Sequence, residues 1–153
     1  MKSFKRVRKY IGLLLALMIF AVTFSHAPVK ADDKYRDTSG GKWVQEEENW
    51  KYQLKNGEYL KEEWVQIDKI WYYFYEDKTM ACDCYIGGYW MDYNGAWTYP
   101  NIASWRSDGK WWYGDDTGWY AKNAWYKIDG KFYHFDSSGY LETNKFIDGY
   151  YVN

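Results

Sequence analysis

The sequence predicts an all-β protein: a β-solenoid of about six stacked β-hairpin repeats of 20–21 residues, placed after an N-terminal signal peptide. Three observations predict this fold. Aromatic residues make up 24% of the 153-residue chain, which is far more than an ordinary core uses. They recur at a nearly fixed interval from residue 43 onward. Over the same stretch no segment of useful length has the 3.6-residue period of an amphipathic helix.

Residues 1–31 have the features of a signal peptide. The first ten residues carry five positive charges and no negative one, and an apolar run from Ile11 to Phe24 follows. Small residues precede the cleavage site that we place after Ala31. An uncleaved membrane anchor is the alternative, but a span needs roughly 20 apolar residues and this run has 14. We therefore expect an exported chain with a linker at 32–42 and a repeat domain at 43–153.

Removal of the leader leaves 14 basic and 21 acidic residues, a net charge of −7. Nucleic acid is therefore an unfavourable partner, because its phosphates require a basic protein face. The mature chain has no second apolar run that could span a bilayer. Its length suits one compact domain or a short array of small units.

An aromatic residue opens each of six units, which we number one to six in chain order. The intervals between these residues are 21, 21, 20, 20 and 21. A second aromatic cluster follows inside each unit, and then a turn glycine, replaced by Lys78 in unit two. Such a period predicts a repeat architecture. The opening residues are Trp43, Trp64, Tyr85, Trp105, Trp125 and Phe146.

Each unit is expected to form a β-hairpin. The opening aromatic lies on the first strand, and a tight polar turn follows. In "WRSDGKWWY" and "WYKIDGKFY" this turn contains Asp-Gly, a pair favoured where both central residues need positive φ. The aromatic cluster forms the return strand, and a linker such as "DSSGYLETNK" turns the chain again. One hairpin is only marginally stable in water, so we expect hairpins that stack and bury rings against their neighbours.

The segments "WVQIDKIWYYFYEDKTM", "WYKIDGKFYHFDSSGYLETNKF" and "FIDGYYV" resemble the cell-wall-binding (choline-binding type) repeats of Gram-positive surface proteins, which are related to glucan-binding repeats. The resemblance covers residues 43–153. It implies a β-solenoid of hairpins in which rings from two successive hairpins form a cage for the choline of teichoic acids. Other members of the family hold glucans or surface oligosaccharides, so both ligand classes stay open.

Both ligands suit aromatic walls. A quaternary ammonium cannot donate a classical hydrogen bond, and each ring face that it contacts contributes roughly 0.5 to 2 kcal/mol. A sugar would instead lay its C–H face on a ring while polar side chains bond its rim. Several weak sites on one polymer would act together through effective concentration.

Residues two apart on a strand share a face. We therefore expect each cage to combine the opening ring, the first ring of the return strand, and the ring two positions further on in the next unit. This register gives three candidate sites: Trp43, Trp50 and Tyr73; Trp64, Trp71 and Trp90; and Trp125, Phe132 and Tyr151, where Tyr151 stands in for Asn153.

Two other junctions depart from the pattern. Gly88 occupies the first ring position of unit three, which should spoil a site with Tyr85. His134 is expected opposite Trp105 and Trp111, where a cationic imidazole would repel an ammonium. We therefore expect two or three competent sites rather than five.

We expect no enzyme activity, no catalytic residue, no metal and no cofactor. The mature chain has one histidine, His134, at a position that the repeat fills with an aromatic ring, and no nucleophile elbow or zinc-protease motif is present. A glycosidase needs only two well-placed carboxylates, but most of the acidic residues lie in turns and linkers. A polysaccharide hydrolase is therefore the less favoured alternative.

Cys82 and Cys84, in "ACDCY", leave three alternatives open. The first is a pair of linker substitutions that can be oxidised to a disulfide, as two cysteines in an exported protein suggest, although one intervening residue makes a small, strained ring. Bridging between molecules is the second alternative. A metal site is the third, though no further Cys or suitable His is near in sequence.

The sequence thus predicts a secreted, non-catalytic protein that is retained at the Gram-positive cell surface. Its expected partner is a cell-wall polymer, either a choline-bearing teichoic acid or a glycan. A structural or adhesin module that binds a partner protein is the competing class. The last unit leaves a strand edge exposed, which makes a homodimer a further expectation.

Overall fold

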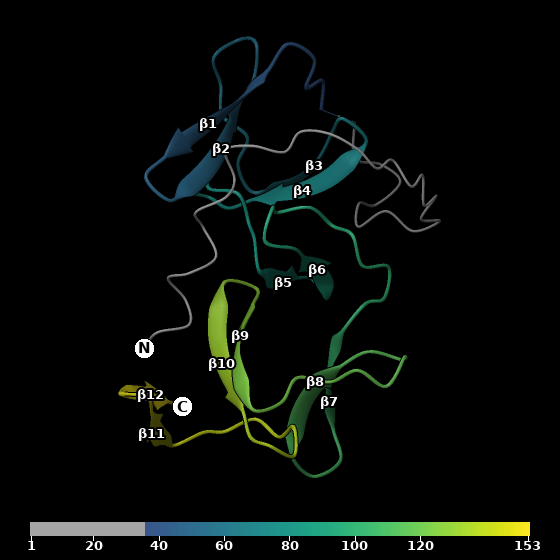
Figure 1. Ribbon diagram of the computed structural model, residues 1–153, viewed down its shortest axis with the longest axis vertical. Helices are drawn as coiled ribbons and strands as arrows, with labels where there is room; N and C mark the ends of the chain where they lie inside the picture. Colours follow the sequence, from purple (N-terminus) through teal and green to yellow (C-terminus); the bar gives the residue numbers. More distant parts are fainter. Residues whose placement is uncertain (1–35) are drawn as a thin grey trace.

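A computed structural model describes residues 36–153. The expected signal peptide lies outside these residues. All regular structure between residues 36 and 153 is β, and consecutive strands pair as six antiparallel hairpins (Figure 1). The strands are β1 (Lys42–Glu46), β2 (Asn49–Gln53), β3 (Glu63–Ile67), β4 (Ile70–Phe74), β5 (Cys84–Ile86), β6 (Tyr89–Met91), β7 (Ser104–Ser107), β8 (Trp111–Gly114), β9 (Ala124–Ile128), β10 (Lys131–Phe135), β11 (Lys145–Ile147) and β12 (Tyr150–Val152). The six predicted hairpins are confirmed.

The hairpin turns follow the predicted chemistry in unit five and differ from it in unit four. Asp129 and Gly130 have φ of 48° and 79°, as a two-residue turn with two left-handed positions requires. In unit four Ser107 pairs with Trp111, so three residues form the turn. Only Gly109 among them has a positive φ, at 109°. The expectation of two positive φ angles at that Asp-Gly pair was therefore wrong, because the shorter unit changes the loop length.

A second turn follows the return strand in units one to five, at the predicted glycine position. The residue there has a positive φ in five units, including the one that carries lysine instead of glycine, where φ is 71°. After this turn the chain makes a single β-bridge to the end of its own return strand, as in Phe74 with Met80 and Phe135 with Leu141. Each of these units is therefore a hairpin closed by a short third segment.

The core lies where one unit packs against the next. Phe74, Met91 and Phe135, at equivalent places at the ends of β4, β6 and β10, are fully buried. Burying a side chain of this size stabilises a fold by roughly 1.5–3 kcal/mol. Three buried clusters follow one another along the chain rather than forming one centre, as expected when each repeat contacts its neighbours.

The hairpins do not form one uniform solenoid. Tyr85 of β5 pairs in parallel with Ile128 of β9, which gives a four-stranded sheet in the order β10-β9-β5-β6. In Figure 1 the hairpins of units one to three occupy one end of the molecule and those of units four to six the other, with β5 and β9 near the centre. The connection after unit three is three residues longer than the others, and it changes the stacking there. No helix among residues 36–153 is long and apolar enough to cross a membrane.

Candidate aromatic cages between hairpins

The strand register decides which rings share a face. In every hairpin the opening aromatic lies directly opposite one residue of the return strand, as Trp43 lies opposite Tyr52. We call that residue position three, so that positions one and three face the same side as the opening ring and positions two and four face the other side. Position one is residue 50, 71, 88, 111, 132 or 149 in units one to six.

The seam between two successive units is formed by these two different faces. The five seams are numbered in chain order, so that the first lies between units one and two. The opening ring of one unit meets the position-two ring of the next unit in four of the five seams. The ring-centroid distances are 5.0 Å for Trp43–Tyr72, 5.6 Å for Trp64–Tyr89, 4.9 Å for Trp105–Tyr133 and 6.1 Å for Trp125–Tyr150. All four pairs are edge-to-face, an arrangement that aromatic pairs prefer.

The predicted third rings were therefore one residue out of register. Tyr73 contacts Trp64 of its own hairpin at 5.4 Å rather than crossing to unit one. Trp90 packs on Tyr85 at 5.0 Å, and Tyr151 packs on Phe146 at 5.2 Å. A slip of one residue moves a side chain to the opposite face of a strand. The opening rings Trp43, Trp64 and Trp125 meet Tyr72, Tyr89 and Tyr150 instead.

A fourth wall closes three of the seams, and the sequence analysis missed it. The backbone N–H of Met80 donates to the carbonyl oxygen of Trp50 (2.7 Å), Trp97 donates to Trp71 (2.9 Å), and Leu141 donates to Trp111 (2.7 Å). These donors are each two residues after the turn position that usually holds glycine. The sequence did contain a signal for the fourth wall, because a large apolar residue recurs at this fixed distance after the turn position.

The first and fourth seams each have a buried floor and a more open rim. In the first seam Tyr52 is 5% exposed and Phe74 is 0% exposed, and both contact Trp43, at 5.1 and 6.1 Å. Trp50 and Tyr72 at the rim are only half-buried. The seam between units four and five repeats this plan with Tyr113 and Phe135 as the buried floor. Ring faces at the rim are thus accessible to a ligand.

The seam between units three and four is filled. Ala103 donates its backbone N–H to the carbonyl oxygen of Gly88 (2.9 Å), the acceptor that binds the fourth wall elsewhere. Tyr85 is 5% exposed, and its ring contacts Tyr113 at 5.2 Å and Trp119 at 5.4 Å. This geometry agrees with the expectation that Gly88 spoils a site here, although the loss of binding stays a prediction.

His134 lies in a different seam from the one expected. Its ring is 5.1 Å from Trp125 of its own hairpin, because it occupies position three. Tyr133, at position two, meets Trp105 instead. The seam between units four and five, which sequence reasoning had set aside, therefore brings Trp105 and Tyr133 together. Trp111, at position one, is 56% exposed at its rim.

The seam between units five and six is the most open. Phe132 is 60% exposed and Tyr150 is 63% exposed. The indole N–H of Trp125 donates to a carboxylate oxygen of Asp148 (3.1 Å), and the ammonium of Lys127 lies 6.0 Å from the Phe132 ring. Polar groups thus surround an incomplete ring set.

The phenol of Tyr72, the third wall of the first seam, stays neutral over the physiological range. Burial raises the pKa of Tyr72 to about 12, and burial likewise raises the pKa of Tyr73, Tyr85 and Tyr113. None of these four tyrosines is therefore a phenolate at neutral pH. The attraction that they offer to a cation comes from ring faces.

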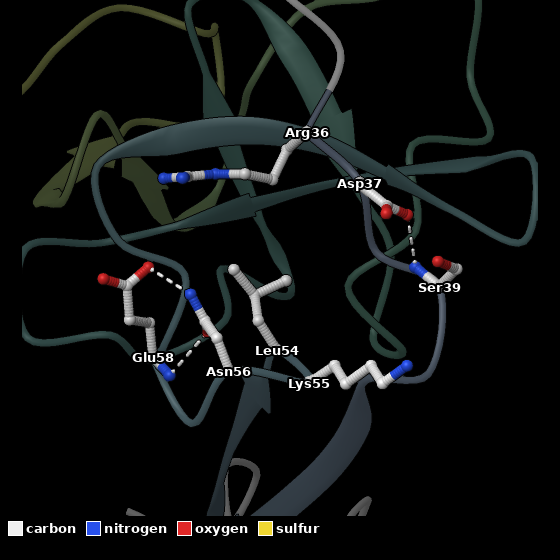
Figure 2. A pocket seen from close by; sticks show the side chains of 7 residues that line it. All are labelled: Arg36, Asp37, Ser39, Leu54, Lys55, Asn56 and Glu58. Atoms are coloured by element: carbon white, nitrogen blue, oxygen red, sulfur yellow. Dashed lines mark hydrogen bonds between the residues drawn. The ribbon is translucent and has the colours of Figure 1, made fainter.

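A surface pocket of about 280 Å³ lies at the start of the described chain. Figure 2 shows its lining: Arg36, Asp37 and Ser39 on one side and Asn56 and Glu58 on the other, with Leu54 at its base and Lys55 at its edge. No aromatic ring lines it. It is charged with both signs and lies away from the ring pairs of the seams.

Cys84 is buried, and no disulfide joins it to Cys82. The hydroxyl of Tyr75 lies 3.5 Å from the Cys84 sulfur, and burial raises the pKa of the Cys84 thiol to about 11. The expected strained disulfide is therefore not formed in this structure, while bridging between molecules stays a prediction. In the described part of the chain, no group of three His, Cys, Asp or Glu side chains could hold a metal ion.

Comparison with known proteins matches two segments of the chain to one family of repeats. Residues 62–77 and 123–141 match the model of the cell wall binding repeat of the choline-binding type, which confirms the resemblance. Comparison with curated protein sequences gives no match.

Three solved structures illustrate the structural similarity. The modular autolysin LytC from Streptococcus pneumoniae is 30% identical over 72% of this chain and 26% of its own, with a TM-score of 0.37. Choline binding protein F from Streptococcus pneumoniae, solved in the presence of a peptidoglycan analogue, is 30% identical over 72% of this chain and 44% of its own, with a TM-score of 0.35. The modular Cpl-1 endolysin, complexed with a peptidoglycan analogue, is 25% identical over 76% of this chain and 28% of its own, with a TM-score of 0.28. The chain thus spans about a quarter of the autolysin and under half of choline binding protein F.

Proposed function

The chain carries cell wall binding repeats of the choline-binding type, and we propose that it is a secreted, non-catalytic binding module that holds the choline groups of a cell-wall polymer in the aromatic seams between its hairpins. One observation carries this proposal. The same four positions, an opening ring, a position-one ring, a position-two ring of the next unit and a large apolar residue after the turn, recur at the first, second and fourth seams.

The chemistry of these positions favours a quaternary ammonium over a sugar. The walls are ring faces with buried apolar floors, and a ligand that cannot donate a classical hydrogen bond loses little on entering them. Three complete seams on one module would engage one polymer together, so weak single sites could give firm retention at the cell surface. We propose four ligand-binding seams in all, of which the last, between units five and six, is incomplete.

Solenoid stacking and self-association belong to the same proposal. Units one to three and units four to six would form two short solenoid stretches joined by the pairing of β5 with β9. The last hairpin exposes Phe146, Tyr150 and Tyr151, which supports pairing of two chains there. Light scattering with and without choline tests this, since a monomeric mass in both conditions would rule out the homodimer.

The test of function is a choline titration followed by tryptophan fluorescence. Choline at millimolar concentration should change the emission, and Trp43→Ala should remove about one site, because it deletes the shared wall of the first seam. Trp112→Ala is the matched control, since it removes a half-buried indole whose ring lies 5.3 Å from the guanidinium of Arg106 and which the proposal assigns to no binding seam. Soluble glucans are titrated in parallel.

The outcomes separate the alternatives. If soluble glucans change the emission and choline does not, the ligand of the seams is a glycan and not choline. If neither ligand acts, the module binding a partner protein becomes the better account. Clearing of cell walls in a zymogram would overturn the non-catalytic assignment.

A further inference from the structure

Unit five replaces part of its seam floor by a polar pair. His134, at position three of β10, lies with its Nδ1 2.5 Å from Oε2 of Glu142. Both side chains are largely buried, each 16% exposed. Glu142 also accepts a hydrogen bond from the ammonium of Lys145. An ionisable pair at such a position is unlike anything in the three complete seams.

The backbone shows that these two residues are the counterparts of apolar pairs elsewhere. The N–H of Glu142 donates to the carbonyl oxygen of His134 (2.9 Å). The same backbone hydrogen bond occurs in units one, two and four. There it joins the residue at position three, always a tyrosine, to a leucine or alanine that lies three residues after the turn position. The pairs are Tyr52 with Leu60, Tyr73 with Ala81, and Tyr113 with Ala121. Both members of the pair therefore change together in unit five.

The imidazole faces the wall of the fifth seam directly. Its ring is 5.1 Å from that of Trp125, at an interplanar angle of 68°. The charged groups around this seam are Glu142 and Lys145 behind the imidazole, Asp148 on the indole N–H, and Lys127 over Phe132. The hydrogen bond from Lys145 and the contact with His134 lower the pKa of Glu142. The carboxylate is therefore ionised at both pH values used below.

The charge of the imidazole decides whether Trp125 is available. A protonated imidazole is itself a cation held against the indole, and it would repel a second cation on the same ring. A neutral imidazole leaves the ring face to the ligand, with an ionised carboxylate beside it. Histidine is the side chain that ordinarily changes charge between pH 5 and 8, and His134 is the only histidine after residue 26. The complete seams contain no such group.

We propose that His134 makes the fifth seam a proton-dependent site for a quaternary ammonium, filled when the imidazole is neutral and closed when it is protonated. This rests on the proposed function, because it assumes that the seams bind such a cation. The first, second and fourth seams bind independently of pH over the same range. The module would thus hold its polymer with one fewer contact in acidic surroundings.

The experiment titrates choline chloride into the full chain at pH 8.0 and pH 5.5, at equal ionic strength, and follows indole N–H resonances by NMR. The resonance of Trp125 is assigned by its loss in Trp125→Phe. Its choline-dependent shift should be present at pH 8.0, and the apparent affinity that it reports should be at least roughly tenfold weaker at pH 5.5. The resonances of Trp43 and Trp64 should respond equally at both pH values.

The double variant His134→Tyr with Glu142→Ala recreates the pair found in units two and four. It should bind choline at Trp125 with the same affinity at both pH values. Trp64→Ala should remove one site equally at pH 8.0 and pH 5.5.

An unchanged Trp125 response across pH in the natural chain would overturn the proposal, and so would a pH effect that persists in the double variant. If the double variant fails to fold, the wild-type comparison of Trp125 with Trp43 decides alone. Absence of any choline shift at pH 8.0, at every indole, would instead overturn the proposed function, and this inference with it.

Discussion

The ring of Tyr72 lies 5.0 Å from that of Trp43, edge-on across the seam between the first two hairpins. Its neighbour in sequence, Tyr73, points the other way and contacts Trp64 at 5.4 Å. Two adjacent tyrosines thus belong to two different seams. The relationship defines which residues a ligand in the first seam would touch.

We predict that Tyr72→Ala weakens binding in the first seam and leaves the second intact. The loss should be about tenfold or more in the affinity of that seam, since one of its cation–π walls is removed. Combining it with Trp43→Ala should add almost nothing, because both changes affect one site, whereas combining it with Trp64→Ala should be additive. Choline titration by calorimetry measures this, and additive losses for Tyr72 and Trp43 would contradict the shared cage.

Phe135 and Phe132 test the division between floor and rim. Phe135 is fully buried and contacts Trp105 at 5.8 Å, while Phe132 on the same strand is 60% exposed. Phe135→Ala should lower the free energy of unfolding by about 3–5 kcal/mol. Phe132→Ala should change it by no more than about 0.5 kcal/mol. Urea denaturation followed by circular dichroism gives both values, and equal costs would argue against the assigned faces.

Gly88 tests the closure of the third seam. A Cβ at Gly88 would lie 2.3 Å from the carbonyl oxygen of Ala103, whereas one at Gly109 would meet nothing within 4 Å, and both glycines have positive φ. Gly88→Ala should therefore destabilise the fold more than Gly109→Ala does, by roughly 1–3 kcal/mol. Thermal unfolding of the two variants measures the difference. Equal midpoints would show that the connection after unit three does not pack as described.

We also predict that the protein loses stability in alkali. Burial raises the pKa of Cys84 to about 11 and that of Tyr72 to about 12, so the folded state retains protons that the unfolded state releases. Stability is full below the ordinary pKa values of these groups, roughly 8.5 and 10. It falls as the pH rises through the folded values, because the unfolded state then binds fewer protons. Melting temperatures at pH 7, 9 and 11 should decline over the upper interval, and Cys84→Ala should lessen the decline between 9 and 11.

The period and turn chemistry were predictable because they are local properties. Opening rings every 20–21 residues, together with the turn positions that follow them, predicted six hairpins, and six are present. Even the lysine at the usual glycine position adopts the left-handed φ that the repeat requires. The turn of unit four was not predictable in this way, because one residue fewer between Trp105 and its partner changes the loop from two residues to three.

The candidate sites were predictable only in part. Trp43, Trp50, Trp64 and Trp71 were identified because they recur, and the structure keeps them at the seams. Tyr73 and Trp90 were misassigned because adjacent aromatic residues look equally suitable in a sequence. His134 was assigned to the wrong seam for the same reason.

The sequence by itself determined the repeat, the hairpins and the excess of rings, because strand alternation and turn preferences depend on residues close together in the chain. Tertiary structure alone decided which face of each return strand meets the preceding unit, where the fourth wall comes from, and that one seam is filled. These depend on register and on packing between units. One residue of slip reverses a face. In the longer connection between units three and four, the backbone of Ala103 bonds to the carbonyl oxygen of Gly88, the position that binds the fourth wall in three other seams.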